Sequence, residues 1–289
     1  ANANANANAN TPLIFGNTYI TAGESAKIQG NVQALTYLVT GANAQLGSVN
    51  TYGEVIVESD IQTGTTVTTG AASLVTGNIQ VGTAITLGAA TIVGHVADDK
   101  NGAACAGTAL TLGAAVIYNA RFVCDASNPE VMTYSRTKLV NAKTDYSSLT
   151  SLDINSRNVL ESMISLNTVL SSSDAYPTTD HHSTNGKPTY VYNTSSLTTG
   201  ADIEITLDGD VNWVFNIENM LSLGEGSEIK LASESKGSVT WNVGGYTSLG
   251  ESSTLVGTVL SNGYVSTGMG STVTAAPSSS GDYCGGLFS

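Results

Sequence analysis

The chain has 289 residues, of which 11% are charged and 6% are aromatic, while glycine alone accounts for 31. Ten Lys and Arg against 23 Asp and Glu give a formal net charge of −13, which offers no basic footprint for nucleic acid or for an anionic membrane. No apolar run approaches the roughly 18 to 20 residues that cross a bilayer. We therefore expect neither nucleic acid nor membrane as a partner, and a surface of small, neutral side chains.

The chain opens with ten residues, Ala1 to Asn10, in which Ala and Asn alternate strictly. Low complexity of this kind is typical of a disordered tail. Strict alternation of small residues also fits an edge strand added to a sheet of the same molecule or of a neighbour. Both alternatives stay open, so we assign 1–12 as a low-complexity N-terminal segment and 13–289 as a single domain.

A five-residue motif recurs beyond this segment: an outward position, an apolar residue, Thr or Ser, any residue, then Gly. Its second and fourth positions face one way and its first and third the other, because side chains alternate along a strand. A return after roughly 18 to 26 residues is too short for a β-α-β unit and suits one coil of a β-solenoid. Clear copies begin at Tyr19, Thr66, Ala84, Ala109, Met220, Tyr246 and Tyr264, and a weaker copy, with one residue missing, covers Leu38, Val39, Thr40 and Gly41.

Three cysteines bear on the compartment of the protein. Cys105 and Cys124 bracket one coil, so we predict that they meet and form a disulfide. A disulfide implies an oxidising, extracellular setting, and we expect a secreted chain. The alternative is three reduced thiols in a cytosolic protein, and Cys284 has no partner under either hypothesis.

The motif is interrupted in the middle of the chain. Asn128, Pro129 and Glu130 supply an N-cap, a proline at the first helical position and an acidic first turn, which together favour a helix. Further apolar spacing fits a short second helix or an irregular packed segment. We therefore expect a helical insertion at about 129–172, after which strand alternation resumes at Tyr190.

Groups that could support catalysis are sparse. His181 and His182 stand beside Asp180, but neighbouring residues diverge and no third metal ligand is suitably spaced. Two acidic segments, 98–102 and 208–210, resemble fragments of calcium loops without the full spacing, and we interpret them as turns. The chain has no nucleophile elbow, phosphate loop or Cys-x-x-Cys metal motif. We predict that the protein is not an enzyme and uses no metal and no cofactor.

Function must then lie in the outward positions of the repeat. Stacked strands lie about 4.8 Å apart, and residues two apart along a strand lie about 6.6 Å apart, so outward groups form a rigid grid. A flat, uncharged grid of methyls and hydroxyls suits an extended periodic partner better than a small molecule, which prefers a concave site. Thr, Ser and Ala are also good residues for any solvated sheet, so this pattern alone leaves both interpretations open. Larger side chains occupy the first motif position at Tyr19, Tyr37, Met220, Tyr246 and Tyr264, which fits a protein contact.

A resemblance to a known family narrows these alternatives. It rests on segments 214–217, 221–224, 239–243, 248–250 and 257–261. With these segments, the stretch from about Leu197 to Ala275 resembles the microbial ice-binding (antifreeze) protein family. The resemblance implies a mainly β protein: a right-handed discontinuous β-solenoid, or triangular β-helix, with one long α-helix packed alongside and one flat face that docks on ice. Carried onto this chain, the ice-binding face would comprise Thr21, Thr66, Thr68, Ala84, Thr86, Ala109, Thr111, Ser222, Ser248 and Ser266.

Two hypotheses follow for the function. The first is a secreted ice-binding protein whose partner is the ice crystal surface and which halts ice growth or inhibits recrystallisation. The second is a structural subunit of an extracellular filament or sheath. It would assemble by β-strand addition of Ala1 to Asn10, helped by the patch of Tyr19, Tyr37, Tyr246 and Tyr264, and it is motivated by the Ala/Asn tail and by extra coils between Gln33 and Val123.

Overall fold

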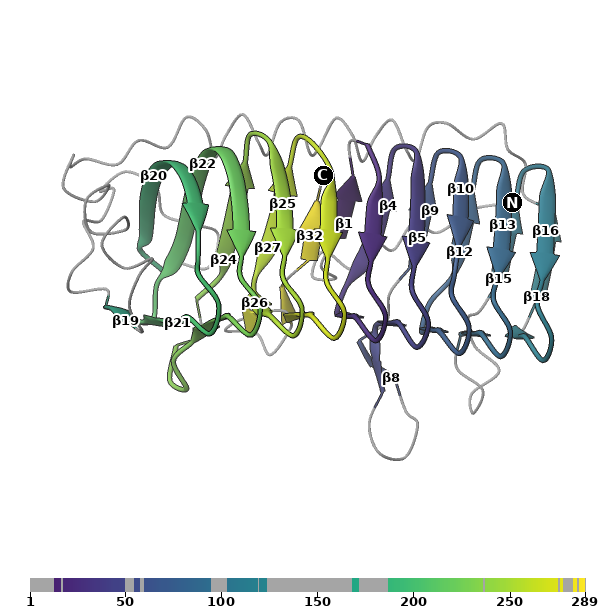
Figure 1. Ribbon diagram of the computed structural model, residues 1–289, viewed down its shortest axis with the longest axis horizontal. Helices are drawn as coiled ribbons and strands as arrows, with labels where there is room; N and C mark the ends of the chain where they lie inside the picture. Colours follow the sequence, from purple (N-terminus) through teal and green to yellow (C-terminus); the bar gives the residue numbers. More distant parts are fainter. Residues whose placement is uncertain are drawn as a thin grey trace.

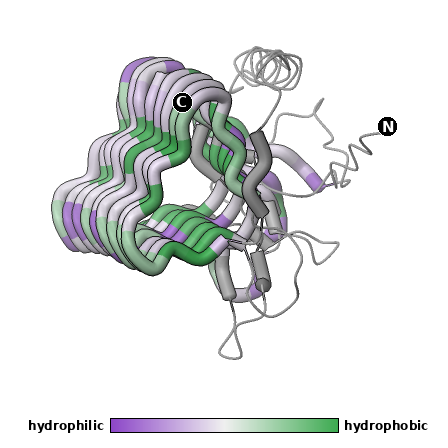
Figure 2. The backbone as a smooth tube through the Cα atoms, turned by 90° about the vertical axis from the view of Figure 1, so that its right-hand side faces the viewer, coloured by the Kyte–Doolittle hydropathy of each residue, from purple (hydrophilic) through white to green (hydrophobic). Residues whose placement is uncertain are grey.

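The computed structural model describes residues 13–16, 18–49, 55–57, 60–94, 103–118, 120–123, 168–171, 187–235, 237–274, 276–277, 283–284 and 286–288. Its described part is a stack of short coils whose parallel strands form three sheets (Figure 1). Figure 2 looks along this stack and shows successive coils superposed around an apolar interior. The described residues contain no helix long and apolar enough to cross a bilayer.

The largest sheet has twelve strands, nine of which carry a copy of the repeat motif. All of its neighbouring strands pair in parallel. From one edge of the sheet to the other they are β16 (Ala109–Leu112), β13 (Ala84–Leu87), β10 (Thr66–Thr68), β5 (Tyr37–Thr40), β2 (Ile20–Ala22), β28 (Val265–Thr267), β25 (Tyr246–Leu249), β22 (Asn212–Leu223), β24 (Val239–Val243), β27 (Thr258–Ser261) and β32 (Gly286–Phe288), with β20 (Thr189–Thr198) paired to β22.

In the C-terminal coils, β24, β27 and β32 pair along the Trp213–Ile217 part of β22 and form a second side of the coil. The other two large sheets supply the remaining sides. The six-stranded sheet contains β1 (Leu13–Gly16), β4 (Asn31–Ala34), β9 (Ile61–Thr63), β12 (Ile79–Val81), β15 (Ala103–Ala106) and β18 (Ala120–Val123). The ten-stranded sheet contains β17 (Ile117–Tyr118), β14 (Ile92–Val93), β11 (Leu74–Val75), β6 (Gln45–Leu46), β3 (Lys27–Ile28), β29 (Thr272–Thr274), β26 (Thr254–Val256), β23 (Glu228–Leu231), β21 (Glu204–Asp208) and β19 (Thr168–Ser171). Two antiparallel pairs complete the set: β7 (Ser48–Val49) with β8 (Val55–Val57), and β30 (Ala276–Pro277) with β31 (Tyr283–Cys284).

The coils are not stacked in chain order. β2 pairs with β28, so Gly23 and Thr267, 244 residues apart, lie in contact. From β2 the N-terminal coils run outward to β16, whereas the C-terminal coils run from β22 back to β28 (Figure 1, purple beside yellow). The junction uses ordinary ladder bonds, such as Gly23 N to Thr267 O at 2.9 Å. We call this junction, between β2–β3 and β28–β29, the seam.

The inward positions of the motif build the core. Ile20, Leu38, Val67 and Ile85 occupy one column and are each 0% exposed. Burying an aliphatic side chain of this size stabilises the fold by roughly 1.5–3 kcal/mol. The C-terminal coils use larger groups, which stack as Tyr192, Trp213, Phe215 and Trp241; the last two ring centroids lie 4.2 Å apart. Each coil therefore needs its neighbour to bury its apolar face, as expected for a solenoid.

The motif glycine allows the coils to turn at close contact. A Cβ on Gly70 would lie 2.3 Å from the carbonyl carbon of Gly41 in the next coil, so no other residue fits there without movement. Two residues later the backbone turns with positive φ, which costs least for small or polar residues. The non-glycine residues at that corner are Ser25, Asn43, Ala72, Ala90, Ala115, Asp202 and Ser252.

The predicted fold class needs a correction. The parallel-strand solenoid fits, but the expected long α-helix alongside it is wrong for the described part, in which every regular element is a strand. Residues 129–167 of the expected helical insertion lie outside the described residues, and its last part, Thr168–Ser171, is β19. Pairing of this β-branched segment with β21 overrides the apolar spacing that favoured a helix there.

Other predictions fall partly or wholly outside the described residues. Cys105 on β15 is disulfide-bonded, and the register pairs it with Phe122; Cys124 is not described, so their bond stays a prediction. The tail from Ala1 to Asn10 and the histidines at 181 and 182 also lie outside the described part. The assignment of 13–289 as a single domain likewise stays a prediction.

Candidate functional site

One straight row of side chains runs along the outer side of the twelve-stranded sheet. Each of nine coils contributes the third residue of its motif, and register pairs link every neighbour in the row. We call it the hydroxyl row, since all its members but one carry a hydroxyl. From one end to the other the row is Thr111, Thr86, Thr68, Val39, Thr21, Ser266, Ser248, Ser222 and Thr198.

A second row runs beside the first and is formed by the first residue of each motif. In the N-terminal coils this row consists of small side chains: Ala109 pairs with Ala84, and Ala84 pairs with Thr66. Thr66 in turn pairs with Tyr37, where the row changes to large side chains. Beyond the tyrosines it ends in Met220 and Ser196. The two rows together make a grid with about 4.8 Å between coils and about 6.6 Å along each strand.

The tyrosines of the second row form a ladder across the seam. Tyr37 stacks on Tyr19 with ring centroids 4.9 Å apart, Tyr19 on Tyr264 at 5.4 Å, and Tyr264 on Tyr246 at 4.9 Å. The interplanar angles are 3°, 1° and 9°, so the rings are nearly parallel. The Tyr246 hydroxyl also donates to Met220 Sδ at 3.0 Å. The two tyrosine groups that lie near opposite ends of the sequence thus form one continuous patch.

A further set of threonines borders the N-terminal part of the grid. Thr65 Oγ1 donates to Thr36 O at 2.6 Å, and Thr108 Oγ1 donates to Thr83 O at 2.8 Å. The Thr83 hydroxyl donates in the same way to Thr65 O. Each bond joins one coil to the next at the corner just before the strand that carries the repeat motif. These bonds hold the corner at a constant spacing and so help keep the adjacent grid regular.

The grid is rigid and uncharged. The residues between its outward members, such as Val67 and Ile85, are fully buried, and Thr has few χ1 rotamers. Neither row contains a carboxylate or an amine. By contrast, the ten-stranded sheet carries Lys230, whose ammonium contacts Glu204 at 2.9 Å and Glu228 at 3.0 Å. Hydrogen bonds to these two carboxylates raise the pKa of Lys230.

The structure places all ten sequence-predicted residues on the outer side of this one sheet. Seven of them are in the hydroxyl row and three, Thr66, Ala84 and Ala109, are in the second row. Two members of the hydroxyl row were missed. Thr198 belongs to a full copy of the motif, Ser196 to Gly200, which was recognisable in the sequence. Val39 takes the third position of a copy that starts at Tyr37, so that copy lacks no residue, contrary to the prediction.

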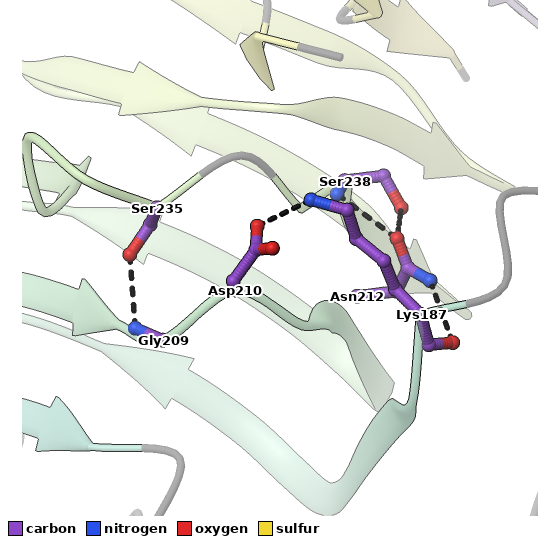
Figure 3. Close-up of polar contacts among 6 residues, drawn as sticks. All are labelled: Lys187, Gly209, Asp210, Asn212, Ser235 and Ser238. Carbon is purple, nitrogen blue, oxygen red and sulfur yellow. Dashed lines mark hydrogen bonds and ion pairs between the residues drawn. The ribbon is translucent and has the colours of Figure 1, made fainter. Parts of the chain in front are cut away.

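The acidic turn at 208–210 has a structural explanation (Figure 3). Asp210 forms an ion pair with Lys187, and Gly209 N donates to Ser235 Oγ at 2.9 Å. Asn212 Oδ1 accepts hydrogen bonds from Ser238 N at 3.1 Å and from Ser238 Oγ at 2.8 Å. These contacts join the beginnings of β20, β22 and β24. In the described part of the chain, no three His, Cys, Asp or Glu residues are grouped as metal ligands would be.

Comparisons with known proteins bear on this face. No family model matches the chain, and no curated protein matches its sequence. Among solved structures, the ice-binding protein from an Antarctic ascomycete, Antarctomyces psychrotrophicus, matches over 91% of this chain and 93% of its own, at 16% identity and a TM-score of 0.37. The chain is thus similar to an ice-binding protein. This is the resemblance expected from the sequence.

Proposed function

We propose that the protein binds ice through the hydroxyl row and through the small side chains of the second row, Thr66, Ala84 and Ala109. The observation that carries the proposal is the register, because it places one outward Thr, Ser or Val from each of nine coils in a single line. A lattice is a flat, periodic and uncharged partner. A flat, periodic and uncharged protein surface is its natural complement, whereas a small molecule needs a concave site.

The chemistry of threonine supports this choice of partner. Its hydroxyl can join a layer of ordered water, and its methyl group offers that water a surface it cannot hydrogen-bond. The backbone ladders hold these groups in place before binding, so little conformational entropy is lost when the face meets a crystal. Many weak contacts, each repeated from coil to coil, would then add up to stable adsorption.

Adsorbed molecules would hold back the advancing crystal between them. The ice front would then curve, and a curved front needs further cooling to grow. The same adsorption would slow recrystallisation, in which large crystals grow at the expense of small ones. Such a protein acts in the water where ice forms first, so we place it outside the cell, in keeping with the disulfide at Cys105.

Thr86→Tyr and Thr111→Tyr test the proposal, because each adds a bulky ring to a flat row. We expect thermal hysteresis to fall severalfold in both, with the circular dichroism spectrum unchanged. Thr272→Tyr is the matched control, since Thr272 faces outward on the ten-stranded sheet and should leave activity intact. Full activity in both face variants, or equal loss in the control, would contradict the proposal.

The alternative role as a filament subunit relies on pairing by the tail from Ala1 to Asn10. Those residues lie outside the described part of the chain, so this role stays a prediction. The tyrosine ladder that was expected to help assembly uses its ring faces for contacts within the molecule. Ring edges and hydroxyls are what it can offer to a partner.

A further inference from the structure

The hydroxyl row is not equally open to water along its length. Four neighbouring members are exposed: Thr111, Thr86, Thr68 and Val39, the last at 38%. The next four, from β2 to β22, are half-buried and lie beside the tyrosine ladder and Met220. Thr198 at the far end is exposed, but its neighbour Ser222 is half-buried. The continuous open stretch of the row therefore covers the four coils from β16 to β5.

Methyl groups are the chemical feature that these four coils share. The threonines of both rows carry a γ-methyl group and Val39 carries two, while Ala84 and Ala109 present a β-methyl group alone. Every outward position from β16 to β10 therefore bears a methyl group, as does the third motif position of β5. A hydroxyl is missing at Val39, Ala84 and Ala109. Of the two groups, the methyl thus forms the more complete lattice.

The half-buried part of the row has a different composition. Its three serines, Ser266, Ser248 and Ser222, carry a hydroxyl but no methyl group. Thr21 carries both, but its neighbour in the second row is Tyr19, whose ring is stacked on both sides. Beyond β5 the row therefore loses its exposure and, except at Thr21, its methyl groups.

The hydroxyls of the open stretch are not oriented by the protein. Within the described part of the chain, the side chains of Thr68, Thr86 and Thr111 form no hydrogen bond. By contrast, Thr65 and Thr108 at the coil corner donate to backbone carbonyls. A free hydroxyl hydrogen can rotate, whereas threonine and valine have few χ1 rotamers and so hold the methyl carbon in place. The group that is both fixed and present in all four coils is therefore the methyl.

We propose that ice is bound through the methyl lattice of the coils from β16 to β5, that Val39 belongs to the contact, and that the hydroxyls of this stretch are dispensable. This inference rests on the ice-binding function proposed above. It names what the face recognises: water ordered over an apolar surface, which then merges with the crystal, rather than lattice oxygens that each bond a hydroxyl.

The physical basis is the hydration of small apolar groups. Water in contact with a methyl group has restricted orientational freedom, because it cannot hydrogen-bond to the group and turns its bonds toward other waters. Methyl groups repeated about every 4.8 Å between coils and about every 6.6 Å along each strand impose that order at regular intervals. The half-buried serines beside the tyrosine ladder impose no such order, so the contact ends at β5.

Paired substitutions that remove one group at a time test the inference. Thr86→Val removes the hydroxyl and keeps a γ-methyl, so thermal hysteresis should stay within about twofold of its original value. Thr86→Ser keeps the hydroxyl and removes the methyl, so we expect a severalfold loss. At β5, Val39→Thr should leave thermal hysteresis unchanged and Val39→Ser should lower it. Thr272→Ser and Thr272→Val, on the ten-stranded sheet, are the matched controls and should both retain full activity.

Circular dichroism checks that each variant is folded, since serine is a weaker strand former than threonine or valine. If the serine variants fail to fold, Thr86→Val and Val39→Thr decide. A severalfold loss in Thr86→Val, a clear gain in Val39→Thr, or full activity in folded Thr86→Ser and Val39→Ser would overturn the methyl lattice as the contact. Each of these results leaves ice binding itself in place, which fails only if Thr86→Tyr and Thr111→Tyr keep full activity.

Discussion

The second row has small side chains in the N-terminal coils and the tyrosine ladder further along the same sheet. These two parts of one face have different surfaces. At β10, β13 and β16 the second row is Thr66, Ala84 and Ala109, so both rows carry only small side chains. From β5 to β25 the second row consists of stacked tyrosine rings, while the hydroxyl row continues beside them. An identical backbone grid thus supports two kinds of surface. The side chain at one position of each motif decides which kind each coil presents.

Breaking the grid itself should have the largest effect. Gly70→Ala places a Cβ 2.3 Å from the Gly41 carbonyl carbon, so adjacent coils must separate and we expect a loss of more than about 3 kcal/mol in unfolding free energy. Gly200→Ala is the matched control, since its Cβ would meet Ile203 Cγ1 at 3.9 Å, an ordinary contact. We expect a change within about 1 kcal/mol there. Urea denaturation of both variants measures the difference, and similar losses would contradict the role assigned to close coil contact.

The next test compares the two surfaces by function. Ser248→Tyr changes the hydroxyl row beside the tyrosine ladder, where the surface is already uneven, whereas Thr86→Tyr changes it where both rows are level. We expect Ser248→Tyr to lower thermal hysteresis by less than twofold and Thr86→Tyr to lower it severalfold. Losses of equal size would show that the tyrosine ladder does not weaken the contact between ice and the neighbouring part of the hydroxyl row.

A smaller effect should follow from cutting the ladder. Tyr19 stacks on two rings and lies at the seam, whereas Tyr37 stacks on one. Aromatic pairs contribute about 0.5–1.5 kcal/mol each, so Tyr19→Ala should cost about 1–3 kcal/mol from lost ring contacts and Tyr37→Ala about half of that. Thermal unfolding checks the ratio. Equal costs would mean that the rings do not help to hold the seam together.

The smallest effects should come from pH. The raised pKa of Lys230 means that its ion pairs stabilise the fold fully below pH 10.5, its ordinary value, and that this stabilisation is lost as pH rises through the folded pKa. Because neither outer row has a carboxylate or an amine, thermal hysteresis should stay constant from about pH 5 to about pH 9. A clear pH optimum within that range would place a titratable group in the ice contact.

Much of the coil could be predicted from the sequence, because its alternation is local. The apolar second position of the motif, as at Val67 and Ile85, correctly marked the inward side. All ten candidate face residues proved to share one sheet side for the same reason. The helix expected to extend to residue 172 failed at β19, because pairing with β21 is a long-range contact that local spacing does not register. Val39 was misplaced because a valine stands where the other coils have a hydroxyl.

By itself the sequence determined that this protein is a stack of coils with small outward side chains and aliphatic inward ones. That follows from strand alternation, which every residue obeys wherever its coil lies. The tertiary structure alone decided which coils are neighbours. Each coil edge offers the same ladder of peptide groups, so local sequence does not distinguish a seam between β2 and β28 from stacking in chain order. That choice joins the distant Tyr19 and Tyr264 into one ladder and extends the hydroxyl row across the seam.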